Sequence, residues 1–134
     1  MKKLFLYIVF LFSLSISAQE CRDSIEEKTE IKNLKLYKEN AHASYYHDKF
    51  DGRKTASGVR FDNSKLTAAH KKLPFGTKLK ITNEKNNKSV IVIITDRGPF
   101  INGREIDLSK KAFMDITSNK KGGVVFVKIE IIEN

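Results

Sequence analysis

Residues 94–100 have the sequence Ile-Thr-Asp-Arg-Gly-Pro-Phe, and they follow an apolar run that extends from Val90 to Ile94. The apolar run predicts a buried strand, and the Gly-Pro pair predicts a turn directly after it. Asp96 therefore lies where the strand ends, beside the fixed positive charge of Arg97. A carboxylate held by the scaffold in this way suits an acid/base residue or an anchor for a polar ligand. In isolation, Asp-Arg-Gly is more often a turn in which the Asp caps its own backbone.

The chain from residue 41 onward consists mostly of short strand patterns. Alternating or continuous apolar residues predict strands at 42–46, 66–70, 77–82, 89–95 and 124–132. A short helix is expected at 109–116, capped by Asp107 or Ser109 and with its apolar residues on one side. About six short strands and one helix favour a compact, mostly β barrel.

The first 18 residues have the pattern of a secretory signal peptide. Lys2 and Lys3 precede the apolar stretch 4–14, and Ala18 offers a small residue for cleavage. A retained membrane anchor is the alternative, but the apolar stretch is short for a span. We therefore expect an exported protein, periplasmic or extracellular, with no stable membrane insertion after cleavage.

Cys21 raises the question of lipid attachment, because a cysteine just after an apolar segment can carry a lipid. Glu20 occupies the place where a small residue is normally needed, so we expect no lipid anchor. Cys21 is also the only cysteine of the chain, which excludes an internal disulfide. The fold must therefore depend on its hydrophobic core.

The composition fits one basic domain of modest size. The 134 residues include 25 Lys and Arg against 16 Asp and Glu, a net charge of +9. Residues 19–40 are polar and charged, and we expect them to form a linker or tether before a domain at 41–134. An exported basic protein meets anionic wall polymers and lipid headgroups more often than nucleic acid, although the lysines can also be a solvated face.

Several short motifs follow one another in an order and spacing that closely resemble the rare lipoprotein A family of lytic transglycosylases. The resemblance covers residues 41–132, and each motif is weak alone. The motifs are Ala43-Ser44-Tyr45-Tyr46, 52–58, Phe61-Asp62, Leu66-Thr67-Ala68-Ala69-His70, 73–77, Thr82-Asn83, 96–100 and 104–109.

The resemblance implies a six-stranded double-psi β-barrel with one short helix. It also implies endolytic cleavage of β-1,4 bonds between N-acetylmuramic acid and N-acetylglucosamine in peptidoglycan, preferably in strands without stem peptides. A muramic acid hydroxyl attacks its own anomeric carbon and leaves a 1,6-anhydro end. By this resemblance Asp96 is the acid/base residue and His70 its companion. From the residue alone, without the matching motif around it, the preferred interpretation of His70 is a strand-end histidine bonded to a backbone carbonyl.

Five further residues are expected to contact the sugars: Tyr45, Ser57, Asp62, Arg97 and Arg104. Each has a structural alternative, because aromatic residues of short strands usually belong to the core and an Arg near Asp residues often forms an ion pair. The histidines at 42, 47 and 70 lack metal-ligand spacing. We therefore expect neither a metal nor another cofactor.

One position departs from the family pattern. Val59 follows Thr-Ala-Ser-Gly, where the family usually carries a Glu that belongs to its active-site cluster. Asp62 lies three residues on and is a candidate substitute. The departure leaves open a non-catalytic peptidoglycan-binding or wall-loosening barrel. A module recruited by cell-envelope or division proteins is a third reading, and we expect a monomer in each case.

Overall fold

The computed structural model describes residues 33–117 and 122–133. The predicted signal peptide and most of the predicted linker lie outside these residues. Within the described ranges, no helix is long and apolar enough to cross a membrane.

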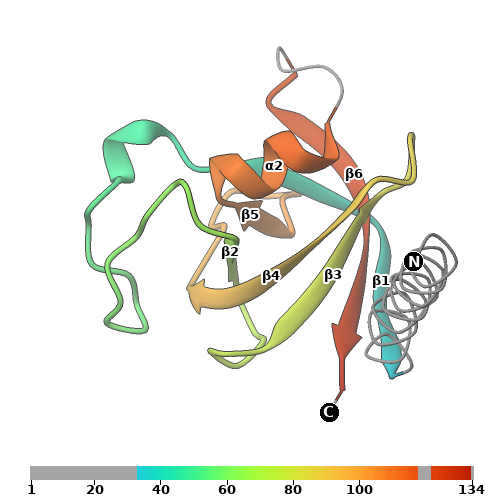
Figure 1. Ribbon diagram of the computed structural model, residues 1–134, viewed down its shortest axis with the longest axis horizontal. Coiled ribbons are helices and arrows are strands. Elements are labelled where there is room, and N and C mark those ends of the chain that lie inside the picture. The colour runs from blue at the N-terminus through green and yellow to red at the C-terminus, as the bar shows by residue number, and fades with distance from the viewer. Residues whose placement is uncertain (1–32, 118–121, 134) are drawn as a thin grey trace, which may run out of the picture. The chain divides into compact units, whose positions relative to one another are not determined.

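Six strands form a closed barrel, and Figure 1 shows their arrangement. They follow one another around the barrel in the order β1-β5-β2-β4-β3-β6. The pairs β1–β5 and β2–β4 are parallel and the other four pairs are antiparallel. The prediction of a six-stranded, mostly β barrel with one short helix is confirmed. The bounds are β1 Leu34–Tyr45, β2 Thr67–His70, β3 Lys78–Asn83, β4 Ser89–Asp96, β5 Ile106–Leu108, β6 Val124–Ile132, the 3-10 turn η1 Asp48–Phe50 and the helix α2 Lys110–Ile116.

Strand alternation fills the barrel with aliphatic side chains. Every second residue of β3, β4 and β6 points inward, so that Ile81, Val92 and Ile129 are fully buried. The helix α2 packs over β4, β1 and β5 and buries Phe113 (Figure 1). Its N-cap is Ser109, whose hydroxyl accepts a hydrogen bond from the helix backbone. The site described below is therefore built on a rigid, packed support.

The barrel begins earlier than the sequence indicated. Residues 34–40, expected as part of the linker, form the first half of β1 and pair with β6. Register shifts on either side of Lys38 interrupt the alternation of inward and outward residues, and Asn40 has a positive φ of 49°. This irregularity hides the strand from a search for period-two patterns. The three-residue β5 is too short to have been predicted in the same way.

His70 closes the end of β2 with both ring nitrogens engaged. Its side chain is 1% exposed. Nδ1 accepts hydrogen bonds from the backbone N–H groups of Lys72 and Leu73, both at 3.1 Å. Nδ1 therefore carries no proton, and Nε2–H donates to Glu105 at 2.9 Å. Glu105 also accepts a hydrogen bond from Lys38 at 2.8 Å. Burial lowers the pKa of His70, although Glu105 acts in the opposite direction.

We expect acid to destabilise the barrel through His70. Its folded-state pKa is lowered by burial, whereas the pKa of an unfolded histidine is about 6.5. The unfolded state therefore binds more protons below that pH, and the free energy of unfolding should fall as the pH drops through this window. His70→Gln should remove this component and cost about 1–3 kcal/mol at pH 8, since it leaves buried donors unpaired. Urea unfolding of both proteins at several pH values measures the pH dependence and the loss of stability. An unchanged pH dependence in His70→Gln would contradict the role of His70.

Candidate functional site

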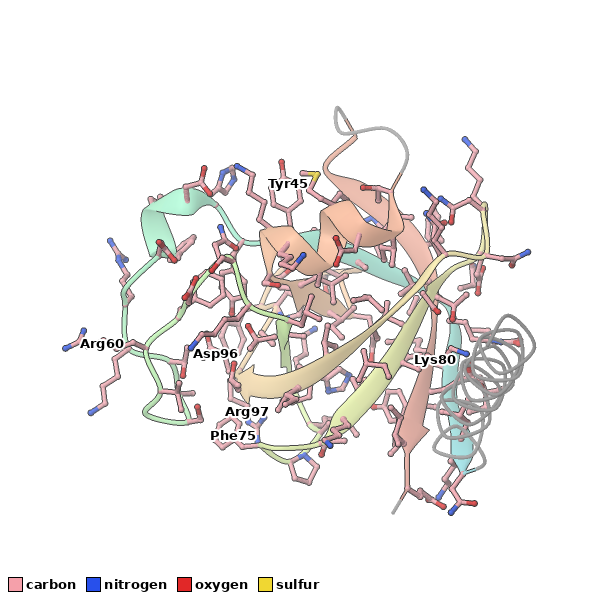
Figure 2. All side chains as sticks on the ribbon, viewed as in Figure 1. Tyr45, Arg60, Phe75, Lys80, Asp96 and Arg97 are labelled. Atoms are coloured by element: carbon pink, nitrogen blue, oxygen red, sulfur yellow. The ribbon has the colours of Figure 1, made fainter. Side chains whose placement is uncertain are left out.

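The carboxylate of Asp96 is held at the end of β4 by three hydrogen bonds from different segments. The hydroxyl of Tyr46 donates to Oδ2 at 2.7 Å. The backbone N–H groups of Ala56 and Arg97 each donate to Oδ1 at 2.9 Å. Figure 2 shows Asp96 on the side of the barrel where the long loop after η1 passes. The side chain is only partly buried, so it is fixed in place and still accessible.

A shift in strand register brings Asp96 to the outer face of the barrel. Ala68 pairs with Ile94 of β4, but the next residue, Ala69, pairs with Asp96. Ala68 and Ile94 belong to the hydrophobic core. Without the extra residue, alternation would place Asp96 on the same inner side as Ile94. With it, Asp96 shares an outer face with Asp107 of β5, which also pairs with Ala69.

The guanidinium of Arg97 fastens the turn after β2 to the end of β4. It donates to the carbonyls of His70 at 3.3 Å and Leu73 at 2.8 Å. It also lies over the ring of Phe75, 4.0 Å from the ring centroid, and Figure 2 shows the two side chains together below Asp96. The sequence suggested a charge pair between Arg97 and Asp96. In the structure it is the backbone N–H of Arg97 that bonds to the carboxylate.

His70 is connected to Asp96 indirectly. The ring bonds to Glu105 and to the backbone of the following turn, and the His70 carbonyl accepts from Arg97. Arg97 in turn donates its N–H to Asp96. This arrangement suits a residue that positions Asp96 better than one that exchanges a proton with it. Glu105, the ring's partner, was not singled out from the sequence, because nothing there indicates that residues 35 positions apart meet.

Tyr46 is the aromatic residue next to the carboxylate. Burial, and then its hydrogen bond to Asp96, raise the pKa of Tyr46 far above the ordinary range, so the phenol keeps its proton. Its ring packs against Phe61 at 4.4 Å between centroids. Tyr45, the residue expected to contact sugars, instead packs against Phe113 of α2 at 4.7 Å. Figure 2 shows Tyr45 beside the helix and apart from Asp96.

The loop before β2 forms one side of the site. The N–H of Ser57 donates to the carbonyl of Thr95 at 3.2 Å, which places Ser57 beside Asp96. The loop is braced by Thr55, whose N–H and hydroxyl both donate to the carbonyl of Val59 at 2.8 and 2.6 Å. The Val59 side chain itself is 58% exposed. The backbone carbonyl of residue 59 thus stabilises the loop. The exposed side chain takes no part in these hydrogen bonds, so other residue types can replace Val59 without breaking them.

Arg104 belongs to the same outer face, through Ser44 and Asp107. Its guanidinium donates to the Ser44 hydroxyl and to Asp107 Oδ1, and Ser44 also donates to Asp107 at 2.5 Å. Asp62 accepts hydrogen bonds from Ser64 and lines a hollow together with Lys110 and Met114 of α2. The fold therefore brings Ser57, Arg97 and Arg104 to the face of Asp96, whereas Tyr45 packs against α2 and Asp62 lines the hollow beside that helix.

In the part of the chain that the structure describes, no set of side chains matches a metal site. No group of three or more His, Cys, Asp or Glu side chains there could hold a metal ion. The chemistry available at Asp96 is that of a fixed carboxylate, a protonated phenol and backbone donors.

Relatives with curated names share about half of the aligned residues. An endolytic peptidoglycan transglycosylase RlpA of Rickettsia felis is 48% identical over 105 residues, which are 76% of this chain and 46% of the relative. The protein of the same name in Pasteurella multocida is 47% identical over 102 residues, 76% of this chain and 34% of the relative. The chain thus spans less than half the length of these two relatives.

Solved structures share the barrel at lower identity. The Streptomyces papain inhibitor aligns with a TM-score of 0.56 at 22% identity, over 70% of this chain and 93% of its own. The expansin of Clavibacter michiganensis aligns with the same TM-score at 18% identity, over 70% of this chain and 50% of its own. These two likenesses show the fold alone. The family model described as lytic transglycolase matches residues 38–129, and the chain therefore belongs to this family of double-psi β-barrels.

Proposed function

We propose that this barrel is an exported endolytic transglycosylase that cleaves β-1,4 bonds between N-acetylmuramic acid and N-acetylglucosamine in peptidoglycan. The observation that carries the proposal is the carboxylate of Asp96, fixed by three donors on an accessible outer face. The names of the curated relatives support the same substrate class.

The reaction needs one group that first donates a proton and then accepts another. The bond between the muramic anomeric carbon and the bridging oxygen breaks, and that oxygen takes a proton from the acid. The 6-hydroxyl of the same muramic acid bonds to the anomeric carbon and loses its proton to the resulting base. Asp96 serves in both roles. Its Oδ1 already accepts two hydrogen bonds and its Oδ2 only one, so Oδ2 has the lone pair available for substrate.

The surroundings of Asp96 suit this one-carboxylate scheme. Hydrolytic glycosidases use a pair of carboxylates flanking the bond. Of the other acidic residues discussed above, Asp62 bonds to Ser64, and Asp107 is held by Arg104 and Ser44. No water needs to be activated when a hydroxyl of the sugar attacks.

A second candidate function is a peptidoglycan-binding or wall-loosening barrel that does not cut. The observation that favours it is Val59, an apolar residue where the family usually has a Glu. A non-catalytic binding protein would use the outer face to bind glycan strands and would carry out no proton transfer.

Replacement of Asp96 by Asn should abolish cleavage and preserve the fold, because the amide cannot exchange the two protons. The measurement is mass spectrometry of sugars released from peptide-free glycan strands. Anhydro-ended fragments should form with the native protein and be absent with Asp96→Asn. Asp115→Asn is the matched control, since Asp115 is an exposed partner of Lys111 on α2. A native protein that leaves the strands uncut, or an active Asp96→Asn variant, would overturn the mechanism.

Loss of the Tyr46 hydroxyl should slow the reaction and leave binding nearly unchanged. Tyr46→Phe removes the only donor to Oδ2 seen in the described residues and keeps the ring against Phe61. A hydrogen bond to a charged group contributes about 1.5–3 kcal/mol, so kcat should fall roughly 10- to 100-fold. Steady-state kinetics on strands of one length give kcat and KM separately. A rise in KM at constant kcat would mean that Tyr46 only binds substrate.

Introducing a carboxylate at position 59 distinguishes the transglycosylase from the non-catalytic binding barrel. Val59→Glu should raise the cleavage rate of an active native protein several-fold, whereas Val59→Gln, similar in size but uncharged, should not. If the native protein binds strands without cutting them and Val59→Glu gains cleavage, the chain is a binding barrel. Equal rates for both variants would show that position 59 plays no part in the chemistry.

A further inference from the structure

A hollow lies at the outer surface of the barrel, and strand pairing connects it with Asp96. Its volume is about 360 Å³, within the usual size of small-molecule sites. We propose that this Phe126 hollow is a second sugar-binding subsite that holds a distant pyranose of the same glycan strand; the proposal rests on the proposed function. Its lining residues are Lys38, Asn40, Ala41, His42, Gly103, Glu105 and Phe126.

The lining offers the two surfaces that a pyranose needs. Phe126 is 51% exposed, and its ring centroid lies 5.5 Å from that of His42. An aromatic ring can stack on the C–H face of a sugar. Next to it, the ammonium of Lys38 and the carboxylate of Glu105 form an ion pair at 2.8 Å. They supply donors and acceptors for hydroxyls, and their opposite charges favour a neutral ligand over a phosphate.

An unsatisfied polar atom also lies at this hollow. Among the described residues, the two buried side-chain atoms that lack a hydrogen-bond partner are His42 Nδ1 and Arg104 Nε. Of these two residues, His42 lines the hollow. Because an unpaired buried polar group is costly, His42 Nδ1 favours a polar occupant or ordered water there.

Strand register connects the Phe126 hollow with Asp96. Phe126 of β6 pairs with His42 of β1, and Ser44, two residues on, shares the outward side with His42. Ser44 pairs with Asp107 of β5. Asp107 and Asp96 then flank the same residue of β2. The polar cluster around Arg104 therefore lies between the two sites, along one surface.

The distance along this surface sets the length of ligand that reaches both sites. Phe126 of β6 and Asp96 of β4 lie four strands apart along this path and two strands apart through β3, because the barrel is closed. Neighbouring strands are about 4.8 Å apart, so a ligand that reaches both sites has to cross at least two strand spacings of the barrel surface. A strand of several sugars can occupy the site at Asp96 and the Phe126 hollow together, and such a subsite would favour long strands, as an endolytic enzyme requires.

The test compares Phe126→Ala with Ile91→Ala for binding of peptide-free glycan fractions separated by length. Ile91 is similarly exposed, at 47%, on the outer face of β4 and does not line the hollow. Both changes are made in the Asp96→Asn background of the mature chain, so that strands stay intact. Isothermal titration gives the affinities, and thermal unfolding confirms that both variants fold. NMR amide shifts at Glu105 and residue 126 report occupancy directly.

Long strands should bind the parent more tightly than short ones, and Phe126→Ala should weaken binding of the long fraction about ten-fold. Binding of the short fraction and all binding by Ile91→Ala should stay unchanged. Equal affinities of Phe126→Ala and the parent for long strands, with no shift at Glu105, would overturn the subsite and leave the proposed function standing. If the native protein neither binds nor cuts strands of any length, the proposed function fails and the subsite with it.

Discussion

The three hydrogen bonds to the carboxylate of Asp96 are the constraint on which the site depends. They come from Tyr46 beyond the end of β1, from Ala56 in the loop before β2 and from the neighbouring Arg97. Two segments distant from Asp96 in sequence, those of Tyr46 and Ala56, must therefore be in place before Asp96 is held. The guanidinium of Arg97 adds a third segment, because it binds the turn that His70 organises after β2. Folding of the barrel and assembly of the site are one event.

The outward position of Asp96 gives the protein its accessible face. One extra residue in the pairing of β2 with β4 moves the carboxylate from the core side to the surface. The same surface then carries the cluster of Arg104, Ser44 and Asp107 and, beyond it, the Phe126 hollow. An elongated face of this kind suits an elongated polymer better than an enclosed pocket would.

Sequence patterns predicted the strands whose residues alternate regularly, and they located Asp96 at the end of its strand. They did not reveal β5 or the first half of β1, since β5 is three residues long and β1 is interrupted by register shifts. They also did not separate Tyr45 from Tyr46, because adjacent strand residues face opposite sides and the choice of side depends on pairing. The bond between Glu105 and His70 is likewise a product of the closed barrel.

A crystal structure of Asp96→Asn with a long peptide-free glycan strand would show where the glycan lies and which atoms the side chain at position 96 contacts. We predict that the strand lies across the outer face of β5 and β2, with a muramic glycosidic oxygen within hydrogen-bond reach of that side chain. The muramic 6-hydroxyl should lie on the same side of that oxygen. A strand bound on another face of the barrel, with position 96 facing solvent, would contradict the role of Asp96 and the face assigned to the glycan.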